Sequence, residues 1–250
     1  MKGVYKIVIL SVLLFLLCTD CGKYIILKHY VSAYVLELSD WDGSRREYDL
    51  NEFNNTIHVR MLPKRSVSWN SNEHNKSIYM KYARQNKDLS WNKEVQMYSH
   101  AHLKSKNFIF TANYVDDITV IAESDWDDNT PAGSSLDDKF IFISASPDSY
   151  IRNGYYIDRN KMDEALNKAD PKIRETIAWY LEESLYTMFP VYDTLSKVKF
   201  EDYRLLGFVS YWFMLYCTEP IPKGAKINIK ISLDNGETVH YRYTTKGTLN

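Results

Sequence analysis

Alternating apolar and polar positions indicate that this chain consists mostly of β-strands. In residues 57–61, apolar side chains alternate with His58 and Arg60, which is the pattern of a strand with one buried face, and Pro63 ends the strand. The polar residues 66–76 then predict a loop. By the same reasoning we expect further strands at 24–39, 78–83, 108–114, 118–122 and 140–145.

Two features near the C-terminal end predict the best-defined strands. Residues 225–233 and 238–245 each alternate apolar with polar positions, and the Asp-Asn-Gly turn at 234–236 predicts that they form a β-hairpin in which the glycine supplies the positive φ. Residues 205–218 are nearly all apolar or aromatic, which predicts a central strand buried on both faces and bent at Gly207.

Between these strands the spacing of apolar residues changes to that of α-helices. Asp158 can cap a helix over 159–169, and Asp170 with the proline after it can begin a second helix. The second helix has apolar residues on one side and charged residues on the other, which favours packing on a sheet over insertion in a membrane. We therefore predict a helical insert at about residues 159–188 in a mainly β fold.

The N-terminal residues have the order of a secretory leader. Lys2 and Lys6 precede an apolar run at 7–17, and Cys18 and Cys21 follow it. A transmembrane helix needs about 20 consecutive apolar residues, and this run has eleven. A cleaved leader is therefore favoured over an uncleaved membrane anchor.

The two cysteines indicate a leader of the lipoprotein type, in which the cysteine after the cut is acylated and holds the protein at a membrane. Neither Cys18 nor Cys21 follows the small residue that cleavage prefers, so both remain candidates for lipidation, with a soluble secreted form as the alternative. With the cut before Cys21, residues 1–20 are the signal peptide. The remaining residues 21–250 are long enough for one large β domain or two small ones. We expect a single domain, enlarged by a loop and hairpin region at about 45–107.

Composition and charge exclude several classes of protein. The chain is 45% hydrophobic with few glycines and prolines, which is typical of a globular domain, and its 20 tyrosines suit half-buried strands. The formal net charge is −1 without a basic stripe, so nothing supports nucleic-acid binding. Cys217 stands alone outside the leader, which excludes a disulfide framework and favours a small buried hydrophobic side chain over a nucleophile.

An acidic stretch offers the best candidate for a metal site. Asp125, Asp127 and Asn129 have the one-three-five spacing of a calcium loop, and Asp137 and Asp138 could add oxygen ligands. The glycine and the bidentate glutamate of an EF-hand are both missing. A non-standard Ca²⁺ site is therefore weighed against a solvated turn whose aspartates bond their own backbone.

The tryptophans of the N-terminal half are the second candidate. Trp41, Trp69 and Trp91, with the tyrosines around them, could stack on sugar rings or contact a protein ligand. Most such residues belong to a core. Binding of a polysaccharide here is an alternative function.

Motifs of common enzymes are missing from the sequence. It contains no Gly-Xaa-Ser-Xaa-Gly elbow, no His-Glu-Xaa-Xaa-His helix and no phosphate-binding loop. We therefore expect a non-enzymatic protein, with a hydrolase as a distant alternative.

Two stretches resemble a known family. Residues 118–140, with the sequence Pro-Ala-Gly-Ser-Ser-Leu-Asp-Asp at 131–138, resemble a segment of small uncharacterised cell-envelope lipoproteins from Bacteroidales, and residues 215–245 are similar to their final strands. The resemblance implies an immunoglobulin-like antiparallel β-sandwich anchored at the outer membrane, on its periplasmic or surface face. It implies no assigned activity and no functional residues.

Overall fold

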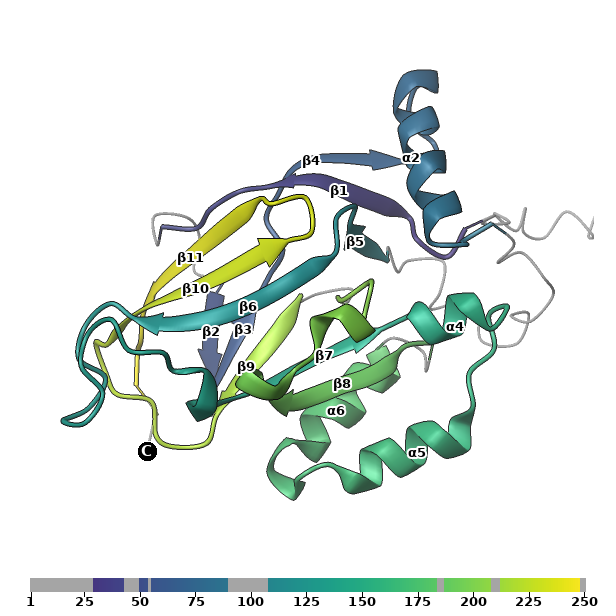
Figure 1. Ribbon diagram of the computed structural model, residues 1–250. Helices are drawn as coiled ribbons and strands as arrows, with labels where there is room; N and C mark the ends of the chain where they lie inside the picture. The colour runs from purple at the N-terminus through teal and green to yellow at the C-terminus, as the bar shows by residue number, and fades with distance from the viewer. Residues whose placement is uncertain are drawn as a thin grey trace, which may run out of the picture.

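The computed structural model shows a mostly β protein with three sheets and few helices (Figure 1). It describes residues 29–42, 50–53, 55–89, 108–183, 187–207 and 212–247. The described strands are β1 (Ala33–Leu38), β2 (Leu50–Phe53), β3 (Thr56–Val59), β4 (Pro63–Ser68), β5 (Ile109–Thr111), β6 (Val115–Ala122), β7 (Phe140–Ser146), β8 (Phe189–Thr194), β9 (Phe213–Cys217), β10 (Lys226–Leu233) and β11 (Thr238–Thr244). The described α-helices are α2 (Glu73–Gln85), α4 (Asp148–Arg152), α5 (Arg159–Lys168) and α6 (Pro171–Glu183).

The strands form one large antiparallel sheet and two smaller sheets. The large sheet has the order β2-β3-β9-β7-β8, and an antiparallel sheet has the order β11-β10-β6. The third sheet, β4-β1-β5, is mixed, because β1 runs parallel to β5 and antiparallel to β4. Figure 1 shows α5 and α6 on one side of the large sheet and β6, β10 and β11 on the other.

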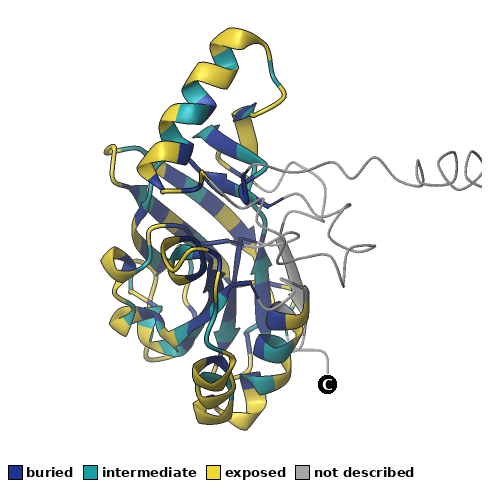
Figure 2. Ribbon diagram, turned by 90° about the vertical axis from the view of Figure 1, so that its right-hand side faces the viewer, coloured by how far each residue is buried: buried dark blue, intermediate teal, exposed yellow. Residues whose placement is uncertain are grey.

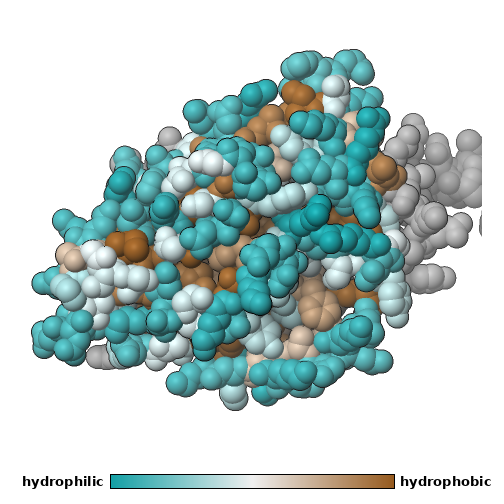
Figure 3. Space-filling view, in the orientation of Figure 1, coloured by the Kyte–Doolittle hydropathy of each residue, from teal (hydrophilic) through white to brown (hydrophobic). Residues whose placement is uncertain are grey.

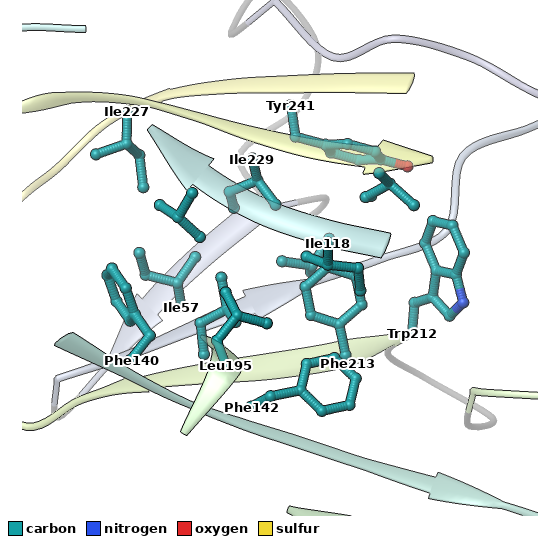
Figure 4. Packing of buried hydrophobic residues seen from close by; sticks show 14 of the residues in the cluster. Ile57, Ile118, Phe140, Phe142, Leu195, Trp212, Phe213, Ile227, Ile229 and Tyr241 are labelled. Carbon is teal, nitrogen blue, oxygen red and sulfur yellow. The ribbon is translucent and has the colours of Figure 1, made fainter. Parts of the chain in front are cut away.

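The main core lies between the large sheet and the β11-β10-β6 sheet. Ile227 and Ile229 of β10 point toward Phe140 of β7 and Phe213 of β9 (Figure 4). All four are buried to within 1% of full coverage. Burying one such side chain is worth about 1.5–3 kcal/mol, so this alternating contact fixes which face of each strand points inward.

A second core covers the other face of the large sheet. Ile143 of β7 and Met214 of β9 point away from the first core and pack with Ile173 and Ile177 of α6. Strands β7 and β9 are therefore buried on both faces, which explains why the sequence there is continuously apolar. Figure 2 shows the resulting contrast between buried strands and the exposed outer surfaces of the helices.

Several local predictions are confirmed. The β10–β11 hairpin pairs from Lys226 with Thr244 to Ser232 with Thr238, and Gly236 in the turn has φ 83°. Helix α5 begins after Asp158, whose side chain accepts hydrogen bonds from two backbone N–H groups of the first turn. The strand buried on both faces is also present, although β9 is shorter than the stretch predicted at 205–218.

The prediction of a strand at 78–83 is wrong, because these residues belong to helix α2. The Asn72 side chain caps the helix by accepting a hydrogen bond from the backbone N–H of Asn75. Tyr79 and Ala83, four residues apart, are its buried side chains. The apparent alternation at 78–83 arises from partly buried positions on either side of this stripe.

The predicted loop at 66–76 is also wrong at both ends, since β4 starts at Pro63 and continues to Ser68, and α2 begins at Glu73. Proline at the first position of an edge strand removes no ladder hydrogen bond. A further correction concerns Asp116 and Asp117, which lie in the gap between the strands predicted at 108–114 and 118–122. Strand β6 runs through both, and the pairing shifts register beside them, between Ser232 and Leu233.

Candidate functional site

The buried carboxylate of Asp88 forms hydrogen bonds with Tyr30 and Val31, which lie just before strand β1. Its Oδ1 accepts a hydrogen bond from the backbone N–H of Tyr30 at 2.8 Å, and its Oδ2 accepts one from Val31 at 2.8 Å. The hydroxyl of Tyr155 donates to Oδ1 at 2.9 Å. Asp88 is 0% exposed. We call these four residues the Asp88 cluster.

The end of helix α2 places Asp88 in this position. Lys87 follows the helix with a left-handed backbone, φ 60°, and its N–H donates to the carbonyl of Arg84. The N–H of Asp88 then donates to the carbonyl of Ala83 at 2.8 Å. This turn directs the Asp88 side chain inward, toward the segment that leads into β1.

Tyrosines surround the cluster and fasten the same segment. The Tyr79 hydroxyl donates to the carbonyl of Val31 at 2.6 Å, and the hydroxyls of Tyr30 and Thr187 lie 2.8 Å apart. The ring of Tyr30 stacks on Phe108 with 4.4 Å between centroids. Part of the tyrosine excess in the composition therefore serves packing and hydrogen bonding inside the domain.

Burial raises the pKa of Asp88 from 3.8, although the hydrogen bonds from Tyr30, Val31 and Tyr155 act in the opposite direction. The folded domain consequently retains the proton to a higher pH than the unfolded chain does. By linkage, the contribution of Asp88 to stability falls as the pH rises from 3.8 through the raised value. The arrangement is that of a structural carboxylate that satisfies backbone donors.

The acidic stretch binds its own backbone and neighbouring side chains. Oδ1 of Asp125 accepts the N–H of Ala132 at 2.9 Å, and Oδ1 of Asp127 accepts that of Asn129 at 2.9 Å. Oδ2 of Asp127 also lies 3.1 Å from Nζ of Lys139. These contacts have the geometry of a turn stabilised by aspartate side chains.

The aspartates at the end of this stretch help to cover the outer edge of β6. The N–H of Val120 donates to Oδ1 of Asp137 at 2.7 Å, and the N–H of Leu136 donates to the Val120 carbonyl at 2.8 Å. Leu136 is fully buried in the first core. Asp138 accepts a hydrogen bond from the hydroxyl of Ser196 at 2.5 Å. The segment thus satisfies backbone groups at an edge strand that would otherwise be open to pairing.

The candidate calcium ligands therefore make two different sets of contacts. Asp125 and Asp127 accept hydrogen bonds within the turn, whereas Asp137 and Asp138 accept them from Val120 of β6 and from Ser196. Within the residues described, no group of three or more His, Cys, Asp or Glu side chains could hold a metal ion. Asn129 lies exposed in the turn and contributes its backbone N–H to Asp127.

The candidate tryptophans do not form a common surface in the described structure. Trp41 is only 5% exposed, its backbone N–H donates to the His240 carbonyl at 2.9 Å, and its ring centroid lies 6.0 Å from that of Tyr243. Trp41 therefore covers the edge of β11 as part of the core. Trp69, in the turn after β4, is 36% exposed, and Trp91 lies outside the described residues.

The structure describes one of the three cysteines, Cys217. Cys18, Cys21 and the rest of the proposed leader lie outside the described residues. Cys217 is 0% exposed in the first core, which confirms its interpretation as a small buried side chain. In the described part of the chain, no helix has both the length and the apolar composition needed to cross a membrane.

Comparisons with known proteins add no relatives. No protein-family model matches the chain. Searches of curated proteins and of solved structures likewise find no match. The fold and its site therefore define a mostly β protein with a buried Asp88 cluster, and its role has to be argued from its own residues.

No local pattern in the sequence indicates the Asp88 cluster. Its partners Tyr30 and Tyr155 lie 58 and 67 positions from Asp88, and the sequence at 78–83, in the preceding helix, predicts a strand. The signal in the sequence is weak: Asp88 is a single acidic residue that follows the apolar positions Tyr79 and Ala83, in a chain rich in tyrosine.

Proposed function

We propose that this chain is an exported, lipid-anchored protein of the bacterial cell envelope, and that its folded domain is a non-enzymatic binding or structural module. The observation that carries the proposal is the order of features near the N-terminal end. A stretch with the residue pattern of a leader is followed by Cys21, then by residues 22–28, and then by the segment that is hydrogen-bonded to Asp88.

The spacing suits a protein held close to a membrane. Seven residues separate Cys21 from His29, and a fully extended chain spans about 3.5 Å per residue. An acylated Cys21 would therefore keep the domain within about 30 Å of the lipid surface. The Asp88 cluster lies where a pull on such a tether would first act on the fold.

The use of the buried carboxylates supports a non-enzymatic module. Catalytic acids and bases commonly have perturbed pKa values, and burial raises the pKa of both Asp88 and Asp148. Yet each of these carboxylates accepts hydrogen bonds from two backbone N–H groups. Their environment suits a structural role.

We propose, further, that the two antiparallel sheets around the first core are a variant of the immunoglobulin-like sandwich. The support is the two-sheet core with inward-facing residues alternating along each strand. The mixed β4-β1-β5 sheet and the helices would be additions to that sandwich.

The mass of the mature N-terminal peptide tests the anchor. Expression of the full chain in a bacterial host should give a membrane-bound protein whose first residue is an acylated cysteine at position 18 or 21. Cys21→Ser and Cys18→Ser form a matched pair, because only the variant that removes the acylated residue should release the protein from the membrane fraction. An unmodified N-terminal residue in the wild type would instead indicate a secreted soluble protein and would contradict the anchor.

A further inference from the structure

A small basic recess lies at the C-terminal end of α2, next to the Asp88 cluster in the chain. Its volume is about 110 Å³. It is formed where α2, α4 and the segment before Leu205 meet, and Figure 1 shows the end of α2 facing α4. The residues that line this basic recess are Gln85, Asn86, Lys87, Asp148, Arg152 and Arg204.

The recess carries an excess of positive charge. It has three cationic side chains and one carboxylate, so its formal charge is 3 − 1 = +2. The Asp148 carboxylate accepts hydrogen bonds from the backbone N–H groups of Arg204 and Leu205. It also lies 3.4 Å from the guanidinium of Arg152. Within the described residues, neither Lys87 nor Arg204 forms a salt bridge with a carboxylate. Asp148, which interacts electrostatically with both Arg152 and Arg204, is the one acidic side chain among the lining residues, so the three cations outnumber it.

The guanidinium of Arg204 lies over an aromatic ring. Its central carbon lies 5.6 Å from the ring centroid of Tyr114. That ring is fixed in turn, because the Tyr114 hydroxyl donates to Oδ1 of Asn86 at 3.1 Å and accepts from Nε2 of Gln85 at 2.9 Å. A positioned guanidinium offers paired donors to the oxygens of a carboxylate or a phosphate.

The backbone at Lys87 brings the third cation to the recess. Residues in the left-handed region are usually glycine or asparagine, and a lysine there is disfavoured. Lys87 nevertheless occupies this conformation at the end of α2, with φ 60°. The space-filling view shows hydrophilic side chains over much of the surface between α2 and the α4–α5 region (Figure 3).

We propose that the basic recess binds the oxyanion group of an acidic ligand, with Lys87, Arg152 and Arg204 as its donors. The inference rests on the proposed role as a binding module and gives that module a ligand class. A water occupies about 30 Å³, so the recess has room for about four waters or for one carboxylate or phosphate group. The rest of the ligand, such as a chain of sugars ending in a uronic acid, would extend into solvent.

Calorimetric titration of the full chain in detergent tests this proposal. The probes are sodium D-glucuronate and inorganic phosphate, with D-glucose as the uncharged control and all titrations at the same ionic strength. We expect saturable binding of at least one anion and none of glucose. Tighter binding of glucuronate would indicate an acidic sugar, and tighter binding of phosphate a phosphorylated ligand.

Three variants locate the binding. Arg204→Gln and Arg152→Gln should each weaken it about tenfold, the value of one charge-assisted hydrogen bond. Lys87→Gly should weaken binding similarly while leaving the melting temperature unchanged or higher, because glycine accepts the left-handed backbone. Lys172→Gln, which removes an exposed cation from α6 outside the recess, should bind as the wild type does.

Two results would overturn the inference: heats that match the glucose control for both anions, or unchanged affinity in all three recess variants. The mass of the N-terminal peptide, measured on the same sample, keeps this result separate from the anchor. An acylated protein that binds no anion retains the anchor and loses the recess as a site. A non-acylated protein that binds anions retains the recess as a site and loses the anchor.

Discussion

Asp88 and the acidic stretch at 125–138 use aspartate side chains for the same purpose in opposite surroundings. In both, carboxylate oxygens accept hydrogen bonds from backbone N–H groups. Asp88 is completely buried and joins segments about 60 positions apart, whereas Asp125 is exposed and bonds a residue seven positions away. The exposed aspartates are conspicuous in the sequence because they cluster, and the buried one is not.

The comparison indicates that burial, rather than clustering, decides how much an aspartate matters to this fold. A backbone N–H without a protein partner costs little stability when water can bind it, whereas an unpaired N–H inside the protein lowers the free energy of unfolding by about 1–3 kcal/mol. The same substitution should therefore have very different effects at the two places.

Asp88→Ala gives the largest expected effect. It leaves two backbone N–H groups and the Tyr155 hydroxyl without their acceptor inside the protein, which should lower the free energy of unfolding by roughly 3–5 kcal/mol. Urea unfolding followed by tryptophan fluorescence measures this loss. Asp125→Ala is the control and should cost less than about 1 kcal/mol, because the Ala132 N–H that it frees is exposed. Equal losses in the two variants would contradict the comparison.

A partly buried histidine, His58, extends the comparison to pH, with a smaller expected effect. Burial, assisted by the charge of Arg60, lowers the pKa of His58 from 6.5 to about 4. The unfolded chain thus binds the proton more readily between pH 6.5 and 4, so stability should be lost as the pH falls through that range, by up to about 3 kcal/mol. Unfolding of the wild type and of His58→Gln at pH 7, 5.5 and 4.5 measures the difference in slope. Parallel curves for the two proteins would show that His58 does not titrate in this way.

Sequence patterns predicted the parts of the fold that depend on neighbouring residues. The β10–β11 hairpin follows from strand alternation and a glycine turn, and α5 follows from its Asp158 cap. Residues 78–83 of helix α2 are predicted to be a strand because their partly buried side chains imitate a period of two. The packing of Tyr79 and Ala83 against distant strands decides in favour of the helix.

The sites depend on contacts that no local pattern records. The Asp88 cluster joins residues from three separate parts of the chain, and the cations of the basic recess come from the end of α2, from α4 and from the segment at Arg204. The acidic stretch was visible in the sequence, but its spacing alone could not distinguish metal ligands from acceptors of backbone hydrogen bonds. Only the placement of Ala132 and Val120 beside those oxygens separates the two interpretations.

Calcium gives the smallest expected effect and tests the exposed half of the comparison. Because the oxygens of Asp125, Asp127 and Asp137 already accept hydrogen bonds, we expect the melting temperature to be the same in millimolar Ca²⁺ and in chelator. A ligand that binds only the folded state would raise it. Asp127→Asn, which keeps an acceptor for the Asn129 N–H but weakens the ion pair with Lys139, should change stability by less than about 1 kcal/mol. A rise with Ca²⁺ that this variant abolishes would restore the calcium site, and would mean that the acidic stretch exchanges its backbone contacts for an ion.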